Sequence, residues 1–397
     1  MKILLAAASF HSHISGLQRH ALNVARCLLQ PPEVSALHVV VAPWQHDLVK
    51  SAGLDSESRL TTHIAEPMTK SSFSRNLWYY RRLPVLAARL EADLVHLTFP
   101  MPVNAAAFSC PTVVTLHDLY PYEIPTNFGF PKSIVNRLTL KQCLRSVDAI
   151  ACVSETTRLR LKQYASPAAW RKSVRIYNCV ESGPPAATES PIPGWLGEPF
   201  LLCVAQHRRN KNISLLIRTV DRLLRSGEID LNMWLVVVGV AGPETRDIHR
   251  LVADRGLGHG IHFLEGLSEP ALLWCYTRCE ALVAPSTTEG FGLPVTEGLL
   301  AGCRIVCSDI PAHREVANSQ CRFVSLLETP EKTLATAIAA VLREPKKQPV
   351  SLPQFSAPVL AKQYMGLYGR LIASATPARS ARMPGSIEIS ASESQSL

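Results

Sequence analysis

Residues 281–302 read ALVAPSTTEGFGLPVTEGLLAG and indicate the fold more strongly than any other stretch. The apolar run Ala281–Ala284 is typical of a buried strand, and a polar loop that contains two glycines follows it. Pro294 suits the first turn of a helix, where no N–H is needed, and Gly302 suits the end of that helix. The stretch therefore predicts a strand–loop–helix unit of an α/β fold, with the loop at the carboxyl end of a parallel strand.

The same alternation of apolar strands and helical patterns occupies most of the chain, with one break rich in proline and glycine. Two α/β units joined by a linker predict two Rossmann-like domains that face a central cleft. We expect a first domain over 1–180, a linker over 181–195, a second domain over 196–352, a helix over 353–374 and a disordered tail over 375–397. The expected strands cover residues 2–8, 37–41, 94–97, 112–116, 149–153, 200–205, 234–238, 261–264, 281–284 and 304–307.

The composition is that of a globular protein with excess positive charge. Hydrophobic residues make up 47% and charged residues 18% of the 397 positions, which excludes wholesale disorder. The 41 Lys and Arg outnumber the 32 Asp and Glu, which gives a net charge of +9. This excess suits an anionic partner such as a nucleotide phosphate, a lipid surface or nucleic acid, without choosing among them.

Neither a membrane span nor a disulfide framework is predicted. No apolar run approaches the roughly 18 residues that a spanning helix requires. The apolar residues 2–8 run directly into a turn and an amphipathic helix, so we interpret them as a buried strand rather than a signal peptide. The eleven cysteines lie mostly in apolar runs, as in reduced cytosolic proteins. The spacing within the pairs Cys275/Cys279 and Cys303/Cys307 would also be compatible with a zinc site. No nearby His or Cys, however, completes a set of zinc ligands at the usual spacing.

Two glutamates accompany the glycines of the loop after residue 284. Gly290 and Gly292 let backbone amides approach a ligand at a helix N-terminus, a favourable place for an anion. Glu289 and Glu297 would repel phosphate, so we expect them to accept hydrogen bonds from hydroxyl groups. A ligand that carries both phosphate and many hydroxyls is a nucleotide sugar. The alternative is that Glu289 caps the helix and Glu297 is a solvated surface residue.

A basic loop, AQHRRNKN at 205–212, follows the first strand of the second domain. It brings His207, Arg208, Arg209 and Lys211 to the carboxyl end of that strand. A departing diphosphate gains negative charge, which such groups would neutralise as a divalent metal does elsewhere. The alternative is a solvated basic turn.

Two residues of the first domain are further candidates for the cleft. His117 stands at the exit of the strand at 112–116, where its side chain would face the cleft. Gly16, between the first strand and the first helix, would bring backbone against the ligand. The alternatives are that His117 is a structural histidine of the core and that Gly16 only serves the turn.

Together these residues resemble the group 1 (family 4) retaining glycosyltransferases with the GT-B architecture. The resemblance covers residues 1–345 and is strongest at 281–317, where Glu289 and Glu297 are separated by seven residues and AGCRIVCSDIP follows. It implies two Rossmann-like domains, the second for the nucleotide sugar and the first on the acceptor side. It also implies that a last helix crosses back onto the first domain.

The resemblance also implies residue roles. Glu297 would bind the donor ribose and Glu289 the transferred sugar, while amides at 291–293 would hold sugar and phosphate oxygens. Lys211 resembles the diphosphate-binding lysine, whereas Asn210 replaces the arginine of the family, so Arg208 or Arg209 is expected to serve instead. The expected catalytic residues are His117, Lys211 and Glu289, and the expected donor-binding residues are Gly16, Arg208, Arg209, Lys211, Glu265, Phe291, Gly292, Leu293 and Glu297.

The implied function is transfer of a hexose-type sugar from a nucleotide diphosphate sugar to a glycan or lipid-linked acceptor, with retention of configuration and without a metal or other cofactor. A nucleotide-sugar 2-epimerase of the same architecture and a non-catalytic nucleotide-sugar-binding relative remain as alternatives. A nicotinamide dehydrogenase is disfavoured, because the glycine fingerprint is absent after the strand at 234–238.

The stretch 70–82 is basic and aromatic, which suggests contact with an anionic membrane. The alternative is a helix of the first domain whose Trp78 faces the core and whose arginine stems cover its edge. Nucleic acid is not expected as a partner, because no recognisable binding module is present. We expect a cytoplasmic protein, peripheral at the inner face of the membrane if that contact forms.

Overall fold

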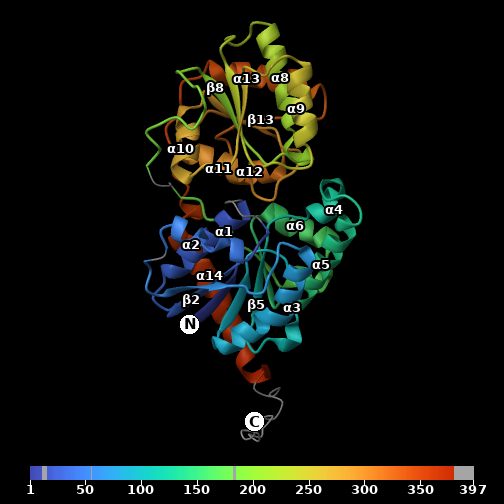
Figure 1. Cartoon of the computed structure of the whole chain (residues 1–397), viewed down its shortest axis with the longest axis vertical. Coiled ribbons are helices and arrows are strands. Elements are labelled where there is room, and N and C mark those ends of the chain that lie inside the picture. The colour runs from blue at the N-terminus through green and yellow to red at the C-terminus, as the bar shows by residue number, and fades with distance from the viewer. Residues whose placement is uncertain (11–15, 55, 182–184, 380–397) are drawn as a thin grey trace, which may run out of the picture.

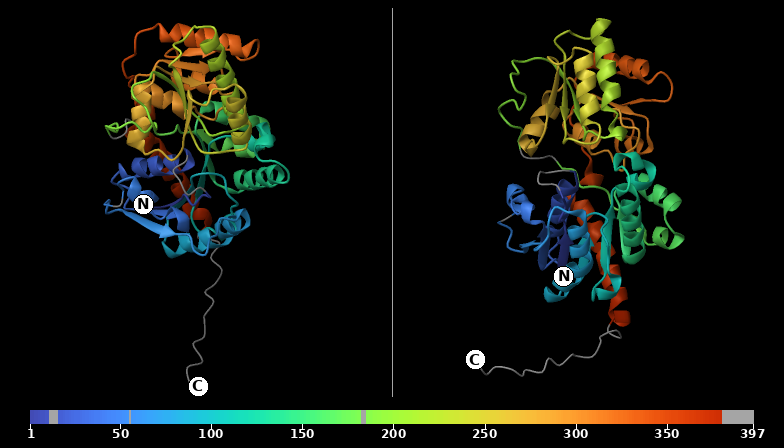
Figure 2. Two further views of the ribbon diagram at one scale, coloured as in Figure 1. Left: turned by 45° about the horizontal axis from the view of Figure 1, so that its top comes forward. Right: turned by 45° about the vertical axis from the view of Figure 1, so that its right-hand side comes forward.

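The chain folds into two lobes, each built on one parallel β-sheet with helices on both faces (Figure 1). The computed structural model describes residues 1–10, 16–54, 56–181 and 185–379. The C-terminal helix lies in the lobe formed by the N-terminal half of the chain, and Figure 2 shows the same arrangement from two further directions. The two expected Rossmann-like domains are therefore present.

The first lobe contains a seven-stranded sheet. Its strands are β1 (Lys2–Ala6), β2 (Ala36–Val41), β3 (Leu60–Ile64), β4 (Leu94–Leu97), β5 (Thr112–Leu116), β6 (Ala149–Cys152) and β7 (Ser173–Arg175), in the order β3-β2-β1-β4-β5-β6-β7. Ile3 of β1 pairs with Leu37 of β2 and with Leu94 of β4, so the N-terminal apolar run is an interior strand, as predicted. Because side chains alternate along a strand, β1 contributes to the hydrophobic core on both faces of the sheet.

Helices cover both faces of this sheet. On one face lie α1 (Gly16–Leu29) and α14 (Ala357–Arg379), and on the other α3 (Ser72–Arg89), α5 (Lys132–Ser146) and α6 (Glu155–Tyr164). The shorter elements are η1 (Pro43–Gln45), α2 (Leu48–Ser51), η2 (Ala105–Ala107), α4 (Tyr120–Glu123), η3 (Pro125–Asn127) and α7 (Pro167–Arg171).

The second lobe contains a six-stranded parallel sheet in the order β10-β9-β8-β11-β12-β13. Its strands are β8 (Phe200–Val204), β9 (Trp234–Val238), β10 (Ile261–Leu264), β11 (Ala281–Ala284), β12 (Ile305–Ser308) and β13 (Arg322–Val324). One face packs against α8 (Ile213–Arg225), α9 (Thr245–Asp254) and α13 (Pro330–Leu342), and the other against α10 (Glu269–Arg278), α11 (Leu293–Leu300) and α12 (Pro311–Ala317). Two 3₁₀ turns, η4 (Arg209–Lys211) and η5 (Pro353–Phe355), complete the lobe.

The C-terminal helix α14 crosses from the second lobe back to the first, as the resemblance implies. Tyr364 and Tyr368 are fully buried in the core shared with α1. The helix begins at Ala357, after η5, and continues past the predicted end at 374 to Arg379, since the alanines at 373 and 375 favour helix. The rest of the expected tail lies outside the described residues. Nowhere in the described part of the chain is a helix long and apolar enough to cross a membrane.

Three short strands, β3, β7 and β13, are absent from the prediction, and each lies at the edge of its sheet. An edge strand is half exposed, so its sequence lacks the continuous apolar run that marks an interior strand. The segment Leu60–Ile64 illustrates this, because all five of its side chains are partly or fully exposed.

Candidate active site

Lys211 and Glu289 meet in the cleft between the lobes. Lys211 ends η4, which follows β8, and Glu289 lies in the loop after β11, the neighbour of β8 in the second sheet. Lys211 Nζ lies 2.5 Å from Glu289 Oε1, and Ser286 Oγ donates a hydrogen bond to the same oxygen at 2.7 Å. The two charged side chains are 17% and 10% exposed, so water screens this ion pair only weakly.

The carboxyl group of Glu289 is ionised. Burial by itself would raise the pKa of Glu289, but the charge of Lys211 and the hydrogen bonds from Lys211 and Ser286 outweigh burial, so the pKa lies below its usual value. Tyr120, from the first lobe, places its hydroxyl 3.3 Å from Glu289 Oε2. Glu289 is thus a carboxylate held by donors from both lobes.

Gly290 brings the loop after β11 into direct contact with the first lobe. A Cβ atom at this position would lie 1.8 Å from the carbonyl oxygen of His117. The carbonyl of Gly290 accepts hydrogen bonds from Ser154 Oγ and, at 3.0 Å, from Thr157 Oγ1. A residue with any side chain would therefore push the lobes apart here.

The turn into α11 has the geometry that the sequence indicates. Gly292 adopts φ of 101°, a left-handed conformation that favours glycine. Phe291 is buried, with its ring centroid 5.3 Å from that of Phe355, so its side chain faces the core rather than the cleft. No described residue accepts a hydrogen bond from the amides of Phe291, Gly292 or Leu293. These amides therefore have no hydrogen-bond acceptor among the described residues.

Glu297, on α11, is bound from both lobes. Arg19 of α1 donates a hydrogen bond to Glu297 Oε1 at 2.8 Å, and Tyr276 of α10 donates to Oε2 at 2.7 Å. The negative charge of Glu297 raises the pKa of Arg19 above its usual value, against the opposing effect of burial. This ion pair connects α1 to the second lobe.

His117 and Asp118 line the first-lobe side of the cleft, at the exit of β5. His117 Nε2 lies 2.8 Å from the carbonyl oxygen of Thr98. Burial lowers the pKa of His117 to about 4, so the imidazole is neutral at pH 7. Burial also raises the pKa of Asp118 to about 6, while its Oδ1 accepts a hydrogen bond from the Tyr120 amide at 3.0 Å.

The two arginines of the basic loop have different surroundings. Arg208 lies close enough to Asp118 and Tyr120 for its charge to counteract the burial that raises the pKa of each. Arg209 is exposed and lines a separate pocket beside Glu289. Asn210 is buried, and its Nδ2 donates to the carbonyl of Thr288 at 3.2 Å. The arginine of the family is therefore replaced by a residue that anchors the neighbouring loop.

Two predicted residues lie at the margins of this arrangement. Gly16 is the first residue of α1 and lies one turn before Arg19. It therefore belongs to the N-terminal end of α1, which contacts the second lobe through Arg19. Glu265 follows β10 and is exposed, and its charge raises the pKa of His207, although burial keeps that pKa below its usual value. The preceding Ser15 lies outside the described residues.

The cysteine pairs form neither disulfides nor a metal-binding cluster. The Sγ atoms of Cys279 and Cys303 are 3.8 Å apart, and both residues are buried as free thiols. Within residues 1–10, 16–54, 56–181 and 185–379, no three His, Cys, Asp or Glu side chains gather in a way that would hold a metal ion.

Several residues in these contacts were missed from the sequence, and Arg19 is the clearest. Arg19, Asn23 and Arg26 recur at helical spacing and form a polar stripe along α1. Asn23 Nδ2 donates to the carbonyl of Cys179 at 2.9 Å, and Arg26 lies 4.0 Å from Glu269. This polar stripe in the sequence could have indicated that α1 contacts polar residues outside the hydrophobic core of the first lobe.

Comparison with known proteins identifies the family. The model of the family described as "Glycosyl transferases group 1" matches residues 188–351, and that of "Glycosyltransferase Family 4" matches residues 14–183. The chain belongs to the group 1 glycosyltransferases of family 4. This glycosyltransferase is 26% identical to the O-antigen chain mannosyltransferase RfbU of Salmonella typhimurium, over 71% of this chain and 76% of that protein.

Another relative has a similar sequence, and a solved structure has the same fold. The GDP-mannose:cellobiosyl-diphosphopolyprenol alpha-mannosyltransferase of Xanthomonas oryzae is 26% identical, over 80% of this chain and 81% of that protein. Sucrose-phosphate synthase from Thermosynechococcus elongatus has the same fold, with a TM-score of 0.67 and 17% identity, over 96% of this chain and 98% of that chain. The glycosyltransferase is a retaining hexosyltransferase of GT-B fold that uses a nucleotide sugar donor, and the epimerase alternative is not favoured.

Proposed function

We propose that this glycosyltransferase transfers mannose from GDP-mannose to a lipid-linked glycan. The names of both reported relatives support mannose as the transferred sugar, and that of the Xanthomonas protein supports GDP as the carrier and a diphosphopolyprenol-linked acceptor. The geometry that carries the proposal is the shielded contact of Lys211 with Glu289 at the carboxyl ends of β8 and β11. It sets a cation and a hydroxyl-binding carboxylate side by side, as the junction between a sugar and its diphosphate requires.

In this mechanism, Lys211 and Arg208 neutralise the departing diphosphate in place of a metal ion. The bond between the anomeric carbon and the phosphate oxygen breaks, and the acceptor hydroxyl oxygen bonds to that carbon on the same face. The hydroxyl proton passes to an oxygen of the leaving diphosphate. Glu289 binds hydroxyls of the transferred sugar, and Glu297 binds the ribose.

The remaining cleft residues bind and orient the donor. The free amides at 291–293 donate hydrogen bonds to sugar and phosphate oxygens. His117 is neutral, so it binds a sugar hydroxyl without placing a positive charge near the reacting carbon. Gly16 and Glu265 complete the donor site as backbone and carboxylate contacts.

A panel of labelled donors tests the proposal. Purified protein is incubated with GDP-mannose, UDP-glucose, UDP-galactose or UDP-N-acetylglucosamine, together with a diphospholipid-linked cellobiose, in the presence of EDTA. We expect transfer from GDP-mannose alone and an α-linkage in the product by NMR. Transfer from a UDP-sugar instead, or complete loss of activity in EDTA, would contradict the proposed donor or the role of the cations.

We also propose that the first lobe docks on an anionic membrane, where such an acceptor resides. Phe73 on α3 is 77% exposed, and Lys70, Arg81 and Arg82 of the same stretch are also exposed, while Trp78 is buried in the core. Exposed apolar side chains beside basic ones match the interface of an anionic bilayer. Flotation with vesicles of phosphatidylglycerol and phosphatidylcholine tests this, and we expect binding that Phe73→Ser weakens. Equal flotation with pure phosphatidylcholine would contradict the charge-dependent contact.

A further inference from the structure

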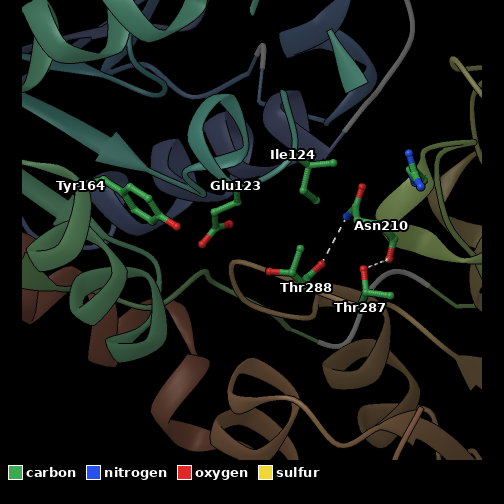
Figure 3. Close-up of a pocket in the computed structure, with 7 residues that line it drawn as sticks. Glu123, Ile124, Tyr164, Asn210, Thr287 and Thr288 are labelled. Carbon is green, nitrogen blue, oxygen red and sulfur yellow. Dashed lines mark hydrogen bonds between the residues drawn. The ribbon is translucent and has the colours of Figure 1, made fainter. Parts of the chain in front are cut away.

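A pocket of about 380 Å³ is lined by residues of both lobes, and Figure 3 shows the side chains that line it. It is formed by both lobes, and its size falls within the roughly 300–1,000 Å³ of small-molecule sites. Thr287 and Thr288, in its wall, directly precede Glu289 in the chain, so the pocket adjoins the reaction centre. We call it the lateral pocket; its lining residues are Glu123, Ile124, Tyr164, Arg209, Asn210, Thr287 and Thr288.

One wall of the lateral pocket carries an oriented carboxylate. Glu123 pairs with Arg160 at 3.2 Å, and the two side chains are only 13% and 18% exposed. Arg160 also donates a hydrogen bond to the carbonyl of Glu289 at 3.0 Å, so it fixes Glu123 relative to the reaction centre. A carboxylate held in this way is a strong acceptor for ligand hydroxyls.

Thr288, in the lining of the pocket, carries a hydroxyl group that has no hydrogen-bond partner among the described residues. The carbonyl of Thr288 accepts from Asn210 Nδ2, and Asn210 Oδ1 in turn accepts from Asn127 of the first lobe at 3.1 Å. The Oγ1 atom of Thr288, in contrast, is buried and has no hydrogen-bond partner among the described residues. A buried hydroxyl without a partner is costly, and a ligand that pairs with it removes that cost.

An aromatic ring and a cation complete the pocket. Tyr164 stacks on Tyr122 with ring centroids 5.4 Å apart, yet it remains 41% exposed, so part of its ring stays open to a ligand. No described residue forms an ion pair with Arg209. An open ring, hydroxyl-binding groups and a free cation together suit a sugar ring that is linked to an anionic group.

We propose that the lateral pocket binds the acceptor, with its terminal sugar on Tyr164 and its hydroxyls bonded to Glu123 and Thr288. Arg209 then contacts the diphosphate that links the acceptor glycan to its lipid. This assigns Arg209 to the acceptor and leaves Arg208 for the donor. The inference rests on the proposed glycosyl transfer to a diphosphate-linked glycan, and it adds the place and the recognition chemistry of that glycan.

Direct binding tests this inference separately from turnover. Saturation-transfer NMR uses cellobiosyl diphosphate as the probe and the full-length protein saturated with GDP. We expect the wild-type protein to bind the probe, Tyr164→Ala and Glu123→Gln to weaken its affinity at least tenfold, and Arg209→Gln to remove the preference for the diphosphate over free cellobiose. All three variants should bind GDP within twofold of wild type. Leu159→Ala is the matched control, because Leu159 lies on the same helix, is 54% exposed and does not line the pocket.

The outcomes separate the two proposals. Probe binding that Tyr164→Ala and Glu123→Gln leave within twofold of wild type would overturn the lateral pocket as the acceptor site, as would failure of the wild-type protein to bind the probe at all. If only the proposed donor is wrong, the protein will bind the probe normally but will not transfer sugar from GDP-mannose in the activity assay.

Discussion

At the level of single residues, the ion pair of Lys211 with Glu289 illustrates how two charged side chains are accommodated where little water reaches them. Each side chain has lost most of its hydration, and each compensates the other. Removal of one partner leaves the other as an unpaired buried charge, which costs more than the pair contributes. The chemistry of this site therefore also affects the stability of the second lobe.

Lys211→Ala is expected to lower kcat/KM at least tenfold, or about 1.4 kcal/mol of transition-state stabilisation, because the diphosphate loses its nearest cation. Steady-state kinetics with GDP-mannose measure the effect. Lys332→Ala is the control, since Lys332 is exposed on α13 and no described residue forms an ion pair with it. Near-normal turnover by Lys211→Ala would show that the lysine is structural.

Glu297→Ala is likewise expected to lower kcat/KM at least tenfold, or about 1.4 kcal/mol, through loss of the ribose contact and of the bond to Arg19. The change should appear mainly in KM for the donor. Isothermal titration with GDP and with guanine checks the ribose contact directly. An affinity loss for guanine equal to that for GDP would refute it.

Asp118→Asn is expected to stabilise the protein at pH 7.5 by up to about 3 kcal/mol. Burial raises the pKa of Asp118 to about 6 in the folded state, so its charge opposes folding at neutral pH. As the pH falls through 6, the folded protein binds a proton and the cost diminishes. The gain from Asp118→Asn should thus vanish near pH 4, and urea unfolding at pH 4, 5.5 and 7.5 measures it. A gain independent of pH would contradict this origin.

At the scale of single elements, α14 shows how a helix from one lobe becomes part of the other. Tyr368 donates a hydrogen bond to His96 Nδ1 at 2.6 Å, and His96 Nε2 lies 2.9 Å from Thr115 Oγ1. Burial lowers the pKa of His96 to about 3, so the imidazole is neutral and both of its nitrogens are satisfied. A helix at 353–374 was predicted from the sequence, but this buried hydrogen-bonded anchor was not.

Tyr368→Phe is expected to destabilise the first lobe by about 1–3 kcal/mol, because it leaves His96 Nδ1 buried without its partner. Chemical denaturation measures the loss, and hydrogen exchange in α14 reports where it acts. Tyr80→Phe, at an exposed position, is the control. Equal stability of both variants would mean that the hydrogen bond contributes nothing.

At the scale of the whole molecule, the backbones of the two lobes are in direct contact at Gly290. The hydrogen bonds from Ser154 and Thr157 to its carbonyl hold the loop with Glu289 against His117. This contact therefore holds the loop of Glu289 beside groups of the first lobe.

Gly290→Ala is expected to hold the lobes apart, since its Cβ would lie 1.8 Å from a backbone oxygen. We expect a larger radius of gyration by small-angle X-ray scattering and a loss of kcat/KM of about tenfold or more, with an unchanged circular dichroism spectrum. Gly258→Ala is the control, because nothing lies within 4 Å of a Cβ there. Wild-type activity in Gly290→Ala would exclude this contact from the catalytic state.

The two α/β lobes, the interior strands, the loops that carry Lys211 and Glu289, and the helix that carries Glu297 could all be predicted from the order of residues along the chain. These features are encoded locally, because apolar periodicity marks buried elements and loops at the carboxyl ends of parallel strands share one edge of a sheet. The pairing of Arg19 with Glu297, the contact of Gly290 with the first lobe and the lateral pocket became apparent only from the three-dimensional arrangement. Those features depend on how the two lobes face one another. That arrangement is set by many weak contacts between residues far apart in the sequence, and such contacts produce no periodic pattern in the sequence.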